Sequence, residues 1–158
     1  MHGPWGIDGY SDHAAWEAYW RDDDALFRTE VGVAGASPPA MIRRFAGHES
    51  YWPPTTSWWR HTAAWWTHWP RLEKRSGVGL TEERLDCYVN ETQHEYLATA
   101  ARWSKVKFPA CDGFVVWMGH DAFPCPSNTS LLDFDGVPKP AAHALRSVFT
   151  STSTAPDL

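Results

Sequence analysis

Apolar side chains recur at helical spacing in five parts of the chain. These are residues 11–22, a segment that starts near residue 38, residues 57–69, residues 81–107 and residues 140–149. Ser11 and Thr81 are residue types that cap helix N-termini, and Pro109 ends the fourth segment. The pattern therefore predicts a chain rich in helix.

Two shorter apolar stretches are predicted strands. Residues 25–33, ALFRTEVGV, lead from a strand into a loop. Residues 113–119, GFVVWMG, form an unbroken apolar run, the pattern of a strand buried on both faces of a parallel sheet. Because helical segments separate the two strands, we expect them to run parallel in an α/β fold. Two parallel strands are too few for a stable sheet, so the chain is expected to be part of something larger.

Composition and charge are those of a globular protein of about one domain. The chain has 158 residues, of which 43% are hydrophobic and 21% are charged. A formal net charge of −5 without a basic stripe argues against nucleic acid as a partner. No apolar run approaches the roughly 20 residues of a membrane-spanning helix, and the N-terminus lacks the pattern of a signal peptide. Neither a membrane partner nor a particular compartment is indicated.

The sequence predicts no metal, and it has no P-loop or dinucleotide-binding fingerprint that would indicate another cofactor. The three cysteines show no Cys-x-x-Cys spacing and leave one unpaired in any disulfide scheme. The eight histidines form no His-Glu-x-x-His motif, and His61 and His68 are about 10 Å apart along a helix.

Aromatic content is unusually high, with eleven Trp, five Tyr and seven Phe. A core of this size does not hide so many rings, so we expect some of them to line a cleft or an interface. The broad aromatic face of residues 57–69 is interpreted as packing rather than as a sugar-stacking wall.

Glu30 stands where a predicted strand meets a glycine-rich turn. The plain interpretation is a helix cap or an ion pair with Arg28 or Arg43. The functional interpretation is catalytic, since the carboxyl ends of strands carry the active groups of α/β barrels. Trp117 lies near the end of the second predicted strand, with His120 and Asp121 just behind it, and the three are expected at the same edge.

The two strand regions resemble family 2 glycoside hydrolases, in particular β-mannosidase, exo-β-glucosaminidase and β-galactosidase-like members. The stretch LFRTEVGVAG is similar to the family's strand seven, whose Phe-x-Ser-Glu-x-Gly pattern carries the nucleophile. The stretch GFVVWMGHDAFP and the turn DFDGVPKPAAHALR resemble its strand-eight region, and the HGPW opening resembles the loop before strand seven. The resemblance implies the last two strands, with their helices, of a (β/α)8 TIM barrel.

The resemblance also implies roles for four residues. Glu30 matches the nucleophile, which forms a covalent glycosyl-enzyme. Apart from the resemblance, the charge of Arg28 is expected to help keep Glu30 ionised. Trp117 matches the tryptophan that forms the floor of the sugar subsite, and Asp121 matches an aspartate that can bind a sugar hydroxyl. His120 completes the implied substrate-binding set.

Three positions depart from the family pattern. Met118 stands for the usual Gln, His120 for the usual Asn and Phe123 for the usual Trp. Because two amide side chains are lost, the preferred sugar does not follow from the resemblance. The expected partner is a β-linked oligosaccharide or glycoside.

A retaining glycosidase needs a second carboxyl group roughly 5–5.5 Å from the nucleophile. In the family this acid/base glutamate precedes the nucleophile in sequence and follows an Asn. Asn90 and Glu91 fit superficially, but they come after Glu30 and within a helical pattern, so we interpret Glu91 as helix surface. The acid/base is therefore expected to be missing.

The interpretation that follows is a fragment of a retaining exo-β-glycosidase. Residues 1–149 would be the C-terminal part of its barrel, and residues 150–158 a disordered tail. The earlier strands and the family's β-sandwich domains would be missing, so the isolated chain is expected to be inactive. The alternative is a non-catalytic, aromatic-rich carbohydrate-binding or structural module.

Overall fold

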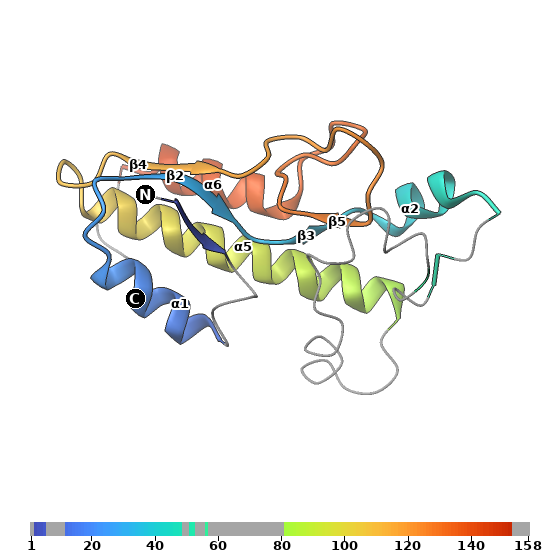
Figure 1. Ribbon diagram of the computed structural model, residues 1–158, viewed down its shortest axis with the longest axis horizontal. Helices are drawn as coiled ribbons and strands as arrows, with labels where there is room; N and C mark the ends of the chain where they lie inside the picture. Colours follow the sequence, from blue (N-terminus) through green and yellow to red (C-terminus); the bar gives the residue numbers. More distant parts are fainter. Residues whose placement is uncertain (1, 6–11, 49–50, 53–55, 57–80, 153–158) are drawn as a thin grey trace.

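The computed structural model describes residues 2–5, 12–48, 51–52, 56 and 81–152. Its elements are, in order, β1 (His2–Trp5), α1 (His13–Asp22), β2 (Phe27–Gly32), β3 (Gly35–Ala36), α2 (Pro39–Ala46), α5 (Glu82–Val106), β4 (Gly113–Val116), β5 (Ser127–Asn128) and α6 (Pro140–Thr150). The predicted helix over residues 57–69 lies outside the described residues, as does most of the predicted tail. The chain is an α/β protein with a small parallel sheet and covering helices (Figure 1).

The main sheet has three parallel strands in the order β1-β2-β4. β2 and β4 are parallel neighbours joined through α5, as the sequence predicts. The expectation of two strands is wrong, because residues 2–5, which the resemblance assigns to a loop, form β1 beside β2. Gly3 and Pro4 read locally as a turn, but pairing with β2 determines the structure here. β3 and β5 form a separate antiparallel pair.

A bulge in β2 decides which side chains face the core. Arg28 pairs with Phe114 and Val31 pairs with Val116, so two residues of β2 oppose the single residue Val115. Val31 is fully buried, whereas Val115 is 50% exposed. The prediction that the second strand is buried on both faces is therefore wrong: helices cover one face of the sheet, and the face that carries Val115 is open to solvent.

The core lies between the sheet and three helices. It joins Trp16 and Trp20 of α1, Val31 of β2, and apolar residues of α5 and α6. The Trp16 indole stacks on the Tyr96 ring at 5.0 Å and donates a hydrogen bond to the Tyr96 carbonyl oxygen at 2.8 Å. In Figure 1, α5 runs for most of the length of the molecule, and α1 lies beside one end of it.

The helix boundaries follow local capping. The Thr81 hydroxyl accepts a hydrogen bond from the Arg84 amide at the start of α5, as predicted. At α1 the cap is Asp12, whose carboxylate accepts from the Ala15 amide, rather than the predicted Ser11. Among the described helices, none combines the length and the apolarity that crossing a bilayer requires.

Candidate active site

Glu30 lies near the carboxyl end of the central strand β2 and contacts β1. Its Oε2 atom is 2.6 Å from Nδ1 of His2, the residue that it opposes in the parallel register. The Glu30 side chain is 26% exposed and the His2 side chain 68% exposed. The carboxylate therefore faces solvent on the side of the sheet that no described helix covers.

Two tryptophans from the neighbouring strands meet beside Glu30. Trp5, the last residue of β1, opposes Gly32, and Trp117 directly follows β4. Their ring centroids are 5.8 Å apart at an interplanar angle of 83°, an edge-to-face contact. His2 packs edge-to-face on Trp5 with centroids 5.6 Å apart. The carboxyl ends of all three parallel strands thus contribute to one cluster, which we call the Glu30 cluster (Glu30, His2, Trp5 and Trp117).

Gly32 makes room for this arrangement. A Cβ atom built on Gly32 would lie 2.3 Å from Cζ3 and 2.4 Å from Cε3 of Trp5. Only glycine at this position lets the Trp5 indole lie across β2. Trp117 is fixed from the other side, because its amide donates to the Val31 carbonyl oxygen at 2.8 Å and its carbonyl accepts from the Thr129 hydroxyl at 2.9 Å.

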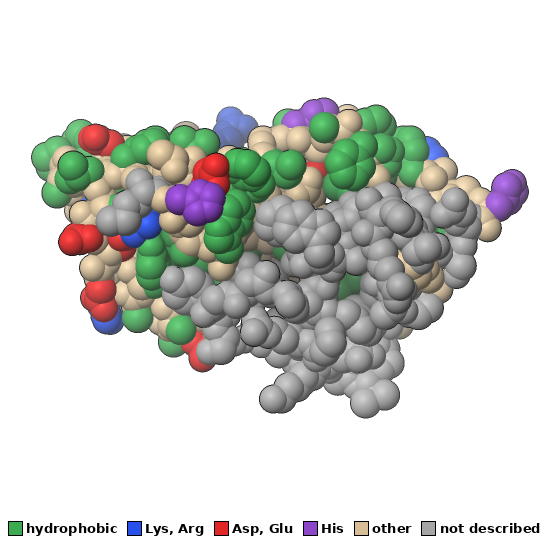
Figure 2. Space-filling view, in the orientation of Figure 1, with side chains coloured by type: hydrophobic (Ala, Val, Ile, Leu, Met, Phe, Trp, Pro, Cys, Tyr) green, Lys and Arg blue, Asp and Glu red, His purple; other side chains and the backbone are tan. Residues whose placement is uncertain are grey.

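The segment after Trp117 is exposed and includes an unusual backbone conformation. Met118 has a φ of 68°, in the left-handed region that non-glycine residues rarely adopt. Its side chain and that of Phe123 are exposed, and so is His120. Figure 2 shows hydrophobic side chains along the margin of the molecule formed by β2, β4 and the loop after β4.

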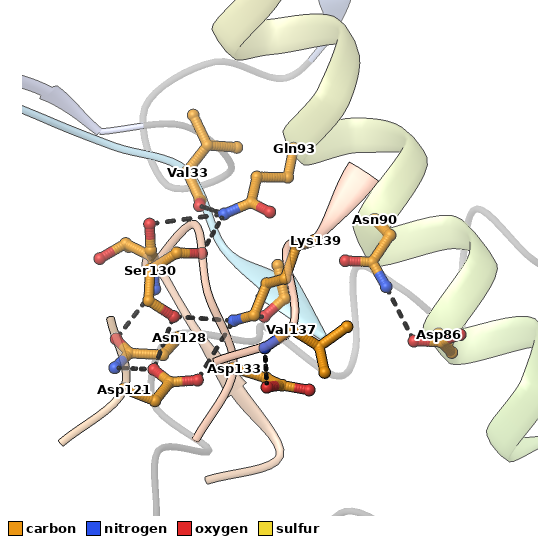
Figure 3. Close-up of polar contacts among 12 residues, drawn as sticks. Val33, Asp86, Asn90, Gln93, Asp121, Asn128, Ser130, Asp133, Val137 and Lys139 are labelled. Carbon is orange, nitrogen blue, oxygen red and sulfur yellow. Dashed lines mark hydrogen bonds and ion pairs between the residues drawn. The ribbon is translucent and has the colours of Figure 1, made fainter. Parts of the chain in front are cut away.

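Asp121 does not join the Glu30 cluster. It is completely buried, and its Oδ1 atom accepts hydrogen bonds from Asn128 at 2.8 Å and Ser130 at 2.6 Å (Figure 3). Its Oδ2 atom is 3.4 Å from the Lys139 ammonium, which also donates to the Ser130 hydroxyl at 2.8 Å. These contacts give Asp121 a structural role, and its full burial does not fit direct contact with a sugar.

Lys139 is itself buried, beside the Asp121 carboxylate. Burial lowers the pKa of Lys139, while the neighbouring Asp121 carboxylate opposes that shift. The ammonium is also 3.3 Å from the Gly35 carbonyl oxygen. Lys139 thus links the loop after β4 to β3.

Gln93 of α5 also holds the loop after β4, through hydrogen bonds to backbone carbonyl groups. Its fully buried amide nitrogen donates to the carbonyl oxygens of Val33 at 3.0 Å, Ser130 at 3.0 Å and Thr129 at 3.4 Å (Figure 3). Thr129 in turn holds Trp117. The loop beside the Glu30 cluster is therefore fastened to the helix layer.

The arginines expected to pair with Glu30 bind other carboxylates instead. Arg28 binds Asp23 through two guanidinium nitrogens and lies over the Tyr19 ring, on the core side of the bulge. Arg43, the other candidate ion-pair partner, contacts Glu82 at 2.8 Å. His2 is the basic side chain in contact with Glu30 instead.

Glu91 is exposed on α5, as the sequence predicts. It lines a surface pocket of about 530 Å³ together with Asp86, Asn90, His94, Glu95 and Pro140. Burial raises the pKa of the Asp86 carboxyl to about 6, and the hydrogen bond that it accepts from Asn90 opposes this effect.

In the part of the chain that the structure describes, no group of three His, Cys, Asp or Glu side chains converges in a way that holds a metal ion. Cys111 and Cys125 are buried and reduced. Burial raises the pKa of the Cys125 thiol to about 12, so it is not a reactive thiolate at neutral pH.

The sequence singled out Glu30 and Trp117, which lie on neighbouring strands, but gave no indication that His2 and Trp5 join them. The alternation of side chains in HGPW is compatible with a strand, but Gly3 and Pro4 are residue types that indicate a turn. The register of β1 with β2 is what brings His2 to Glu30 and Trp5 to Gly32.

The fold is similar to that of a β-D-mannosidase from Dictyoglomus thermophilum, with a TM-score of 0.70 and 18% sequence identity. The match covers 85% of this chain and 17% of the mannosidase chain. No protein-family model matches the chain, and no curated protein matches it. At this identity the likeness establishes the fold: the chain is an α/β unit compatible with part of a barrel and is related in structure to a segment of a glycosidase.

Proposed function

We propose that Glu30 is the nucleophile of a retaining β-glycosidase site, to which this chain contributes the last strands of the barrel. The observation that carries the proposal is the position of Glu30. It is a partly exposed carboxylate near the carboxyl end of a central parallel strand, flanked by Trp117 and Trp5 from the two neighbouring strands. The resemblance of LFRTEVGVAG to a nucleophile motif supports the same assignment.

The chemistry asks for a fixed carboxylate and a surface that holds a sugar ring. A Glu30 oxygen forms a bond to the anomeric carbon as the bond to the leaving group breaks, and the leaving group departs with the electron pair. Trp117, whose amide donates to the carbonyl of the residue after Glu30, offers an apolar ring suited to the C–H face of a sugar. His120 is exposed and available to a substrate, whereas Asp121 acts by holding the loop in place.

The second carboxyl group of the mechanism is assigned to a part of the barrel beyond the described residues. Glu91, the glutamate that follows an asparagine, lies exposed on helix α5. Without an acid/base, natural glycosides with poor leaving groups are not cleaved. We therefore expect the chain alone not to hydrolyse them, and expect further strands to complete the site.

A glycosyl fluoride tests Glu30 without the acid/base, because fluoride leaves without being protonated. The structural neighbour is a β-mannosidase, so 2-deoxy-2-fluoro-β-D-mannosyl fluoride is the first probe, followed by the glucosyl and galactosyl analogues. Once the missing strands are supplied, intact-protein and peptide mass spectrometry should find one fluoroglycosyl group on Glu30. The variant Glu30→Gln should stay unlabelled, and the control Glu91→Gln should label as the wild type does.

The alternative is a carbohydrate-binding module that uses the aromatic pair without chemistry. The edge-to-face pair of Trp5 and Trp117 is the observation that favours it. Sugar binding that depends on Trp117 but leaves Glu30 unlabelled by every probe would support the module and refute the nucleophile assignment.

A further inference from the structure

We propose that His2 is a positioning residue for Glu30. The imidazole donates a hydrogen bond from Nδ1 to Oε2 of Glu30 and thereby presents Oε1 as the attacking oxygen. This inference rests on the proposed function, since it names the residue that orients the nucleophile.

The contact is built into the sheet. His2 and Glu30 are direct partners in the parallel register of β1 and β2, and Nδ1 lies 2.6 Å from Oε2. That distance is short enough for a charge-assisted hydrogen bond. Within the described part of the chain, Oε1 accepts no hydrogen bond, so one carboxylate oxygen is held and the other is open to a reactant.

The His2 ring is oriented despite its exposure. It packs edge-to-face on Trp5, and Trp5 packs edge-to-face on Trp117. The Trp5 indole also occupies the space that a side chain at position 32 would need, and Gly32 leaves that space free. The rings of Trp117, Trp5 and His2 thus pack one against the next and orient the imidazole. Its Nδ1–H group is present in the cationic imidazole and in one neutral tautomer.

Holding the carboxylate matters because attack on an anomeric carbon requires a narrow geometry. Misplacing a reacting group by about 1 Å costs on the order of 100-fold in rate. A carboxylate held only by its own rotatable side chain samples many orientations, whereas His2 restricts Glu30 to one. The expected signature is a loss of bond-forming rate without a loss of sugar affinity.

A first experiment tests the contact itself and needs no catalysis. Long-range proton–nitrogen correlation spectra of the full chain, labelled with 15N-histidine, report which nitrogen of each imidazole carries the proton. We expect Nδ1 of His2 to be protonated in the wild type, with its signals shifted in Glu30→Gln. A neutral His2 with Nδ1 unprotonated would overturn the proposal, because that nitrogen has nothing to donate.

A second experiment tests the consequence, using the rate of labelling by 2-deoxy-2-fluoro-β-D-mannosyl fluoride. We expect His2→Ala to lower the inactivation rate constant by about 10- to 100-fold with little change in the inactivator's dissociation constant. His2→Asn should recover much of the rate, because its amide replaces Nδ1–H as a donor. His143→Ala, on the exposed face of α6, is the matched control and should label normally.

The outcomes separate the two proposals. An unlabelled wild type refutes Glu30 as the nucleophile and this inference with it. A labelled wild type with an equally fast His2→Ala variant overturns only the positioning role. An Ala variant that loses affinity rather than rate would likewise contradict it, since His2 would then be binding the sugar.

Discussion

Trp5 and Trp117 meet edge to face beside the strand that carries Glu30, with ring centroids 5.8 Å apart. They come from the two edge strands of the sheet and are separated by more than a hundred residues in sequence. The contact exists because Gly32, between them on β2, has no side chain. One glycine therefore determines the shape of the surface beside the candidate nucleophile.

Replacing Gly32 by alanine should break this contact. The new Cβ would lie 2.3 Å from a ring atom of Trp5, so the indole must move. We expect the free energy of unfolding to fall by about 1–3 kcal/mol, the usual cost of overpacking. Chemical denaturation followed by tryptophan fluorescence measures both the loss and the changed indole environment.

The matched control is Gly119→Ala, because a Cβ atom on Gly119 meets nothing within 4 Å. It should unfold as the wild type does. Equal stability of the Gly32 and Gly119 variants would show that Trp5 does not pack on β2 as described.

The helices could be predicted from the sequence because their signals are local. Thr81 caps α5, and the apolar spacing that follows continues to Val106. Asp12 replaces the predicted Ser11 as the cap of α1 because adjacent Ser and Asp are equally good caps by type. Local chemistry predicts that a cap exists but does not choose between neighbours.

The site could be predicted only in part, because its remaining members depend on pairing between distant segments. His2 and Trp5 lie in a stretch whose Gly and Pro indicate a turn, and only β2 makes it a strand. The bulge that separates Arg28 from Glu30 likewise has no signature in the sequence. Asp121 follows a strand and looks exposed by position, but its partner Lys139 arrives from a later turn and buries it.

Removing one partner of the buried ion pair between Lys139 and Asp121 should strongly lower the free energy of unfolding. Lys139→Met leaves the fully buried Asp121 carboxylate without its cation, so we expect a loss of about 3–5 kcal/mol in the free energy of unfolding. The double variant Lys139→Met with Asp121→Asn should recover part of that loss. Urea denaturation measures all three proteins.

Arg146→Met removes a positive charge from the exposed face of α6 and serves as the control for charge alone. A double variant as unstable as Lys139→Met would contradict the ion-pair account, because the cost would then lie in lost packing of the lysine chain.

Asp86 should make the stability of the fold depend on pH. Its folded-state pKa, raised by burial to about 6, lies above the ordinary value of 3.8, so the folded protein holds this proton more tightly than the unfolded chain. The resulting stabilisation is present below pH 3.8 and is lost as the pH rises through about 6. Because the carboxyl is only half-buried, we expect solvent screening to reduce the effect to about 1 kcal/mol.

Asp86→Asn removes this dependence while its side-chain oxygen still accepts the hydrogen bond from Asn90. Relative to the wild type, the variant should gain about 1 kcal/mol in the free energy of unfolding between pH 4 and pH 7. Glu91→Gln, exposed on the same helix, should show no such trend. A wild type that becomes more stable than Asp86→Asn toward pH 7 would reverse the sign and refute the assignment.

The nucleophile assignment is tested most directly by the configuration of a product. With a 2,4-dinitrophenyl β-glycoside, the leaving group needs no acid, and added azide replaces the base-activated water in the second step. Two successive displacements at the anomeric carbon retain its configuration. Once the missing strands are supplied, we predict formation of the β-glycosyl azide by the wild type and none by Glu30→Gln. An α-glycosyl azide, or β-azide formed equally by Glu30→Gln, would contradict a covalent intermediate on Glu30.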